Sequence, residues 1–443
     1  MCKKSSMMKK LLLFLFLTSW FIIPLSAQTT SLEDLLFNLP DVKFKKIESP
    51  NSTELTYELN VKQPIDHSDI QKGFFYQKVY LSHKGFDKPT VIVTQGYQVA
   101  QNREQELTEL LNANQLNIEH RFFGESLPDS LNYNYLNLKQ ATADIHHIRQ
   151  LFDQIYSQKW ISTGISKGGS TTIFYRYYYP DDVDVSVSYV APLTNTFEDK
   201  RIYNFLDTIG SNECRQKIKQ FQTRLLENRE RVIPLLHFYS LGAGWDFTYL
   251  TIERAFELAV LEYPFAFWQW GHSCSEIPSE ESTLEESVEY FMKIDPLSLF
   301  NDALIEKYGS HYYQAATEMG YYGYEIKDFK KYLVSIPTNT NPHATFLPEK
   351  MPAEFDGELL KKVHEWLQSD GDEFIYIYGV NDTWTSCAVP ESNEVDAEWF
   401  FMEGKHHGNA RIRNMNDANK ERLISALENW LSLKIDNTLT ESK

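Results

Sequence analysis

One stretch of the chain decides the fold: Trp160-Ile161-Ser162-Thr163-Gly164-Ile165-Ser166-Lys167-Gly168-Gly169-Ser170. A β-branched and aromatic run, 160–163, leads directly into the Gly-x-Ser-x-Gly spacing typical of a nucleophile elbow. The residues from Ser170 to Tyr179 then predict a helix, which Pro180 ends. This context of strand, sharp turn and helix favours Ser166 as a nucleophile over a glycine-rich turn with an incidental serine. At a helix N-terminus, backbone N–H groups favour a developing negative charge.

Further strands and helices extend from the elbow in both directions. Residue patterns typical of strands occur at 54–60, 74–82, 90–94, 116–119, 183–190, 374–378 and 398–402. Helical periodicity follows at 141–155 and 355–368, and again in the helix that closes the chain with Leu423 and Leu427 on its apolar face. Together with the elbow, these elements predict an α/β protein with an α/β-hydrolase core.

Between the predicted strands lies a long block of helical pattern. We expect residues 28–195 and 351–443 to form the two parts of the core, and 196–350 to form an inserted all-helical cap. The densest aromatic stretch of the cap, 261–271, contains Trp268 and Trp270. Most aromatic clusters are simply core, but in a cap they can also form the wall of a substrate pocket.

The N-terminal segment predicts export. Residues 1–27 combine four lysines, an apolar run and a small-residue end at Ser26-Ala27, as in a secretory signal peptide cleaved after Ala27. The alternative, a membrane anchor, would need a longer apolar run. Cleavage removes four lysines and no acid, which changes the net charge from −18 to −22. We therefore expect a secreted or periplasmic protein with no nucleic-acid partner and no membrane attachment after cleavage.

The mature chain would keep three cysteines, Cys214, Cys274 and Cys387, because Cys2 leaves with the signal peptide. An oxidising compartment allows one disulfide, for which Cys214 and Cys274 are the candidates. Three unpaired buried thiols are the alternative.

A serine nucleophile needs a base, and the base needs a group that holds it in one tautomer. Asp382 follows one predicted strand, and His406 follows the next. Chain order is therefore Ser166, Asp382, His406, as in α/β-hydrolases. His406 is preferred for its offset from Gly404, and the adjacent His407 is the fallback. Oxyanion donors are expected at the backbone N–H groups of Lys167 and of Tyr97, which follows the strand 90–94.

Four sequence elements together resemble a known enzyme family. They are Gln63-Pro64-Ile65-Asp66-His67, His120-Arg121-Phe122-Phe123-Gly124-Glu125-Ser126, Gly164-Ile165-Ser166-Lys167-Gly168-Gly169 and Gly404-Lys405-His406-His407. The chain is similar over most of its mature length to the secreted bacterial proline-specific tripeptidyl aminopeptidases, relatives of lysosomal Pro-X carboxypeptidase and dipeptidyl peptidase II. This resemblance implies a hydrolase core, a helical cap and serine exopeptidase chemistry. Gln95 departs from the lysosomal relatives, which carry an acidic residue there.

The resemblance implies removal of tripeptides with proline at the cleaved position from peptides with free N-termini, without metal or cofactor. We expect Glu125 to bind the substrate's ammonium and Trp268 and Trp270 to wall the pocket. Carboxypeptidase activity would instead need a cation, for which Arg121 is the candidate, although a buried Arg121–Glu125 pair would have a purely structural role. Dipeptidyl peptidase and esterase or lipase activities are further alternatives.

Overall fold

A computed structural model of the chain describes residues 31–49, 55–294, 296–347, 351, 353–436 and 439. Within these residues the strands form one nine-stranded sheet in the order β1-β2-β3-β5-β4-β6-β7-β8-β9. The first part of the sheet, through the β3–β5 pair, is antiparallel, and the strands from β5 to β9 are parallel. The strands are β1 Val42–Ile47, β2 Leu55–Pro64, β3 Phe74–His83, β4 Thr90–Thr94, β5 Asn114–Ile118, β6 Trp160–Ile165, β7 Val185–Tyr189, β8 Phe374–Gly379 and β9 Ala397–Met402.

This topology is that of an α/β-hydrolase, and the predicted fold class is confirmed. Each strand predicted from the sequence is present, with ends that differ by a few residues. Strand β1 was not predicted. It pairs antiparallel with β2, and three of its six residues are exposed lysines, two of them adjacent, which weakens the alternating pattern.

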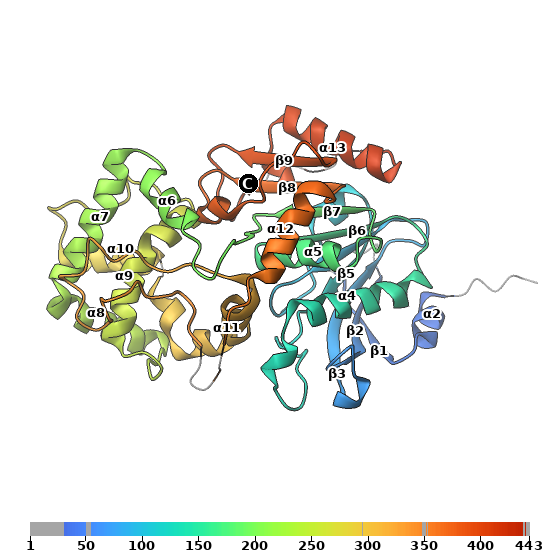
Figure 1. The fold of residues 1–443 in the computed structure, drawn as a ribbon, viewed down its shortest axis with the longest axis horizontal. Helices are drawn as coiled ribbons and strands as arrows, with labels where there is room; N and C mark the ends of the chain where they lie inside the picture. Colours follow the sequence, from blue (N-terminus) through green and yellow to red (C-terminus); the bar gives the residue numbers. More distant parts are fainter. Residues whose placement is uncertain are drawn as a thin grey trace, which may run out of the picture. The chain divides into compact units, whose positions relative to one another are not determined.

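Helices cover both faces of the sheet (Figure 1). On one face, α3 and α13 bury Leu107, Leu423 and Leu427 against apolar side chains of β6, β7 and β8. On the other face, α5 and α12 contribute Phe174 and Leu360 to a second cluster, and α4 packs on α5. These helices are α3 Glu106–Leu110, α4 Leu138–Asp153, α5 Lys167–Tyr178, α12 Glu358–Ser369 and α13 Asp417–Leu431. Parallel strands buried on both faces place their carboxyl ends at one edge, where such folds carry their chemistry.

The described residues up to Leu39 and those from 40 to 439 form two separate compact units. The first contains helix α2 Leu32–Asn38, which begins with a capping box between Ser31 and Asp34. The second contains the whole sheet and the block predicted as a cap. The predicted signal peptide, residues 1–27, lies outside the described residues.

The helical block between β7 and β8 has its own apolar core, which also includes Trp384 and Cys387 from the segment after β8. Its helices are α6 Arg201–Thr208, α7 Asn212–Glu227, α8 Arg229–Ala243, α9 Ile252–Gln269, α10 Leu284–Ile294 and α11 Asp302–Gln314, followed by the π-helical turn η4 Ala315–Met319. They gather in one group in Figure 1. We refer to them as the cap; its boundaries at 196 and 350 stay a prediction.

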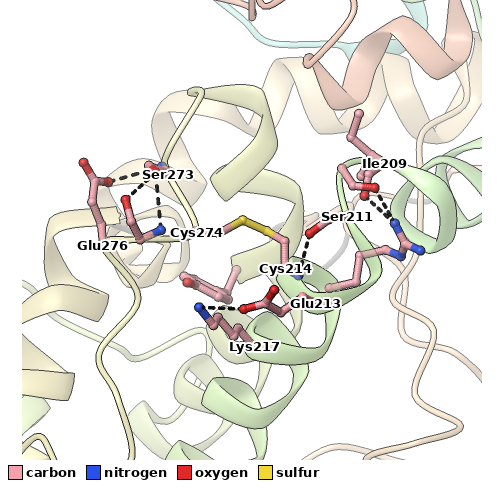
Figure 2. Close-up of a disulfide and its surroundings, with 12 residues drawn as sticks. Ile209, Ser211, Glu213, Cys214, Lys217, Ser273, Cys274 and Glu276 are labelled. Carbon is pink, nitrogen blue, oxygen red and sulfur yellow. Dashed lines mark hydrogen bonds and ion pairs between the residues drawn. A yellow bond between two sulfur atoms is a disulfide. The ribbon is translucent and has the colours of Figure 1, made fainter.

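A disulfide joins Cys214 of α7 to Cys274 in the segment after α9, with Cα atoms 5.5 Å apart (Figure 2). The sequence left this pairing open against unpaired thiols. Cys387 is a buried free thiol, so the bridge is confined to the cap and closes a long loop of it, which restricts the unfolded chain.

No helix within the described residues is both long enough and apolar enough to cross a membrane.

Candidate active site

The elbow at the end of β6 places Ser166 at the N-terminus of α5, as predicted. Ser166 has φ 57° and ψ −127°, a strained backbone conformation for a residue with a side chain. Neighbouring residues must be small for this turn to close. A Cβ atom on Gly164 would lie 2.2 Å from the carbonyl oxygen of Gly168, and one on Gly168 would lie 2.6 Å from that of Thr94. The glycines of the motif are therefore required by backbone contacts on both sides of Ser166.

Asp382 and His407 meet just past the carboxyl ends of β8 and β9, which are separated from the elbow strand β6 by β7. Asp382 follows β8 and begins the short helix η5 Thr383–Cys387, where one of its carboxylate oxygens accepts from the backbone N–H of Trp384 at 3.1 Å. The other oxygen lies 2.7 Å from Nδ1 of His407, which follows β9. Asp382 is fully buried and His407 is nearly so. A carboxylate at Nδ1 leaves Nε2 free to accept a proton, as a general base requires.

The structure contradicts the choice of His406 as the partner of Asp382. The side chain of His406 lies against Gly271, where an added Cβ atom would come within 2.4 Å of its ring, and its Nδ1 accepts from the N–H of Gly408 at 3.3 Å. Burial lowers the pKa of His406. Because the two histidines are adjacent, spacing from Gly404 could not show which side chain turns inward.

A pocket of about 660 Å³ brings Ser166 and His407 together with residues of the cap. The core contributes the two proposed oxyanion residues, Tyr97 and Lys167, and also Ile165 and Arg411. The cap contributes mainly aromatic and apolar side chains: Phe265, Ala266, Trp270, Ile294, Leu299, Tyr308, Tyr312, Met319, Tyr321 and Tyr322. A largely apolar cavity with a few convergent polar groups is typical of a small-ligand site.

The side chain of Lys167 holds the elbow against the loop after β4. Its buried Nζ donates to the carbonyl oxygen of Gly96 at 2.7 Å and to Oε1 of Gln314, the last residue of α11, also at 2.7 Å. Burial lowers the pKa of this amine well below its ordinary value. The Gly96 carbonyl and the Tyr97 N–H belong to one planar trans peptide and point in opposite directions. Holding that carbonyl therefore also fixes the direction of the Tyr97 N–H.

Glu125 and Arg121, both singled out in the sequence, lie outside this pocket. Glu125 has a mostly exposed side chain that pairs with Lys78. Arg121 is fully buried and binds Asp144 through two 2.7 Å contacts. The expected role of Glu125 at the substrate amine is therefore contradicted, and so is the Arg121–Glu125 pair. Both residues follow a strand end, but their side chains turn toward structural partners.

Of the two tryptophans predicted to line the pocket, the structure places only Trp270 there. Trp270 lines it, half exposed, with its ring 5.7 Å from that of His407 in an edge-to-face arrangement. Trp268 is buried against Gly210 and lines a different pocket, on the α6–α7 side of the cap. Residues two apart at the end of a helix face nearly opposite directions, so both could not line the same wall.

Sequence reasoning missed Glu262, a carboxylate in the wall of the catalytic pocket. It lies on α9, and both of its oxygens accept from the hydroxyl of Tyr322 at 3.0 Å. Burial raises its pKa to about 7. Its position three residues before Phe265 places it on the same face of α9, a spacing that could have been noticed once the cap was expected to form a pocket.

Comparison with known proteins identifies the family. The model of the PS-10 peptidase S37 family matches residues 26–435. The chain belongs to this family. One relative is a prolyl tri/tetrapeptidyl aminopeptidase of Streptomyces mobaraensis. The family match and this relative together confirm the resemblance seen in the sequence. That protein is 29% identical over 405 residues, which cover 87% of this chain and 82% of the relative. Together they support a serine-type aminopeptidase.

Two further comparisons involve a carboxypeptidase relative and a solved structure of low sequence identity. A lysosomal Pro-X carboxypeptidase of Pongo abelii is 34% identical over 383 residues, covering 74% of this chain and 76% of the relative. Among solved structures, a proline iminopeptidase of Mycobacterium smegmatis aligns with a TM-score of 0.37 and 12% identity, covering 84% of this chain and 97% of the other.

Proposed function

We propose that this S37 peptidase is an exported exopeptidase that removes tripeptides with proline at the cleaved position from free N-termini. The observation that carries the proposal is the 2.7 Å contact of buried Asp382 with His407, a residue that lines the same pocket as Ser166. Acid, base and nucleophile come from the ends of β8, β9 and β6 in the chain order of an α/β-hydrolase. Export rests on the predicted signal peptide.

In the acylation step, Nε2 of His407 takes the proton of the Ser166 hydroxyl while Oγ bonds to the carbonyl carbon of the proline residue. The C–N bond to the following residue then breaks, and His407 returns the proton to the departing amine. Water, deprotonated by the same imidazole, attacks the acyl-enzyme and frees the peptide acid and Ser166. Asp382 holds the imidazole in its tautomer and stabilises its charged form.

The negative charge of both tetrahedral intermediates falls on the former carbonyl oxygen. Backbone N–H groups of Lys167, at the start of α5, and of Tyr97, after β4, are the proposed donors. The helix N-terminus adds a partial positive charge at the same place. No metal or cofactor takes part in this chemistry.

The apolar wall supports proline as the preferred residue at the cleaved bond. Trp270 lies beside His407, and Phe265 stacks on Tyr322 with ring centres 4.2 Å apart. A rigid pyrrolidine ring loses little conformational freedom when it binds such a slot. An esterase or lipase could use the same triad, but the family is one of peptidases.

Carboxypeptidase polarity has less support from the site. It needs a free cation for the substrate carboxylate, and the candidate from the sequence, Arg121, is held by Asp144 away from the pocket. Lys167 donates to Gly96 and Gln314, and Arg411 donates to the carbonyl oxygens of His407 and Ala410. These basic side chains therefore have partners within the protein.

The test is the rate of cleavage of Ala-Ala-Pro and Ala-Ala-Ala chromogenic amides, each with a free and an acetylated N-terminus. We expect the highest kcat/KM for free Ala-Ala-Pro, a severe loss on acetylation, and a loss when alanine replaces proline. Ser166→Ala is the control, and it should lower kcat by about a millionfold. Equal rates on free and acetylated substrates would overturn the aminopeptidase proposal.

A further inference from the structure

Glu262 is a buried carboxylate that faces the catalytic pocket without a cation. Its side chain is 2% exposed, and no ion pair among the described residues includes it. Its hydrogen bonds come from neutral tyrosine hydroxyls, those of Tyr322 and Tyr324. Taking a carboxylate out of water without a positive partner is costly. Glu262 therefore has an unmet electrostatic requirement.

Four other buried acids among the described residues meet this requirement internally. Glu257 binds Arg229 and the backbone N–H groups of residues 334–336. Asp144 and Asp199 each bind an arginine at 2.7 Å. Glu119 accepts from the backbone N–H groups of Val99, Glu125 and Ser126. Among the described residues that line the catalytic pocket, Glu262 is the only carboxylate.

Helix α9 relates Glu262 to the catalytic histidine. Glu262, Phe265, Ala266 and Gln269 all line the pocket, at the spacing of one helix face. At the end of this face, the carbonyl oxygen of Gln269 accepts from the backbone N–H of His407 at 3.1 Å. Glu262 lies about two helical turns earlier, or roughly 10 Å along the axis. Glu262 is thus separated by about two helical turns from the residue of α9 that holds the His407 backbone.

We propose that Glu262 binds the α-ammonium group of the substrate and that its position along the axis of α9 selects tripeptides. An extended chain spans about 3.3 Å per residue, so the ammonium lies about 10 Å from the cleaved bond for a tripeptide, about 7 Å for a dipeptide and about 13 Å for a tetrapeptide. Of these, the tripeptide matches the separation along α9. This inference rests on the proposed aminopeptidase function and adds the residue that reads the N-terminus.

The ammonium supplies the cation that Glu262 lacks. It also has three N–H donors, which suit a carboxylate that already accepts from two tyrosines. The phenylalanine and alanine between Glu262 and Gln269 on this face offer no competing charge, so the backbone of a bound tripeptide would run along α9 toward His407.

The experiment compares wild type with Glu262→Gln on the chromogenic amides of Ala-Pro, Ala-Ala-Pro and Ala-Ala-Ala-Pro, each free and acetylated. Glutamine has nearly the same shape and can still accept from Tyr322, so the fold should be kept. Titration of Ser166 with an organophosphonate counts competent enzyme and normalises every rate. Glu318→Gln is the matched control. Glu318 is a second largely buried carboxylate with its pKa raised to about 7 by burial, but it accepts from the N–H of Leu138 and lines a different pocket.

For Glu262→Gln we expect kcat/KM on free Ala-Ala-Pro to fall by about thirtyfold or more, the usual effect of removing one partner of a buried charge pair. Rates on acetylated substrates should change little, and the preference for the tripeptide should flatten across the three lengths. Glu318→Gln should behave as wild type.

Two other results would separate the proposals. If wild type prefers free substrates and Glu262→Gln keeps both that preference and the length profile, the role of Glu262 is overturned while the aminopeptidase function stands. If wild type itself shows no preference for a free amine, the proposed function fails first.

Discussion

The backbone N–H of His407 donates a 3.1 Å hydrogen bond to the carbonyl oxygen of Gln269, the last residue of α9. A second bond of this kind joins the same helix to the other catalytic loop, where the hydroxyl of Thr383 donates to the carbonyl oxygen of Phe265 at 3.0 Å. The loops that carry the histidine and the acid are therefore both fixed to the cap.

The two adjacent histidines give a direct test of the site. His407→Ala should abolish labelling of Ser166 by an organophosphonate, because it removes the base that contacts Asp382. His406→Ala should label at close to the wild-type rate, since its ring lies against Gly271. Labelling followed by mass spectrometry measures both. The reverse pattern would restore His406 as the base.

Asp382→Asn should lower kcat by about ten-thousandfold, because an amide beside Nδ1 stabilises the wrong imidazole tautomer. Asp372→Asn is the control. Asp372 is exposed, lies before the start of β8, at the opposite end of that strand from Asp382, and its carboxylate accepts from the N–H of Asp396. Steady-state rates on free Ala-Ala-Pro amide measure both variants. A loss of less than about tenfold for Asp382→Asn would assign the acid elsewhere.

Lys167→Met should lower kcat by about a hundredfold through the loss of one oriented oxyanion donor. The variant keeps its own backbone N–H but releases the carbonyl of Gly96, and with it the direction of the Tyr97 N–H. KM should change little, because the donor acts mainly in the transition state. Gln314→Leu is the matched control: it removes the other acceptor of Lys167 and should cost much less. Equal effects of the two variants would indicate a general packing role for Lys167.

The ratio of kcat/KM for free over acetylated Ala-Ala-Pro amide should rise with pH through about 7, where Glu262 becomes ionised. It should fall again above about pH 8, where the α-amine of the substrate loses its proton. The groups that face Glu262 are Tyr312 of α11 and Tyr321, Tyr322 and Tyr324, whose pKa values burial raises, so they stay neutral throughout. The catalytic base acts on both substrates, so its effect cancels in the ratio.

In Glu262→Gln the rise near pH 7 should be absent while the fall above pH 8 remains, if any preference for the free amine is left. Stopped assays over pH 5.5–9 on both enzymes supply the comparison. A wild-type ratio that is flat from pH 5.5 to 7.5 would contradict the assignment.

Local sequence patterns were sufficient to predict most of the fold and part of the site. The elbow could be predicted because Gly164, Ser166 and Gly168 satisfy a steric requirement within five residues. Asp382 could be predicted because it follows a buried strand in the expected chain order.

The remaining errors concern which way a side chain turns. Glu125 and Arg121 follow a strand end near the site, yet distant partners, Lys78 and Asp144, decide their directions. His406 and His407 differ by one position, and a hydrogen bond to Gln269 of the cap fixes their loop. The spacing of Glu262 and Phe265 could have placed both on one face of α9, but only the packed cap shows that Glu262 lacks a cation. Neither periodicity nor residue spacing in the sequence shows long-range contacts of this kind.

The attachment of α9 to both catalytic loops bears on how such enzymes can diversify. A helical insertion is often regarded as an exchangeable module that can be grafted from one relative onto another. Here the helix that carries the pocket wall also positions the acid and the base, through Phe265 and Gln269. Replacing the cap would disturb the chemistry along with the specificity. Changes of substrate preference are therefore expected to arise by point substitutions along α9 more readily than by domain exchange.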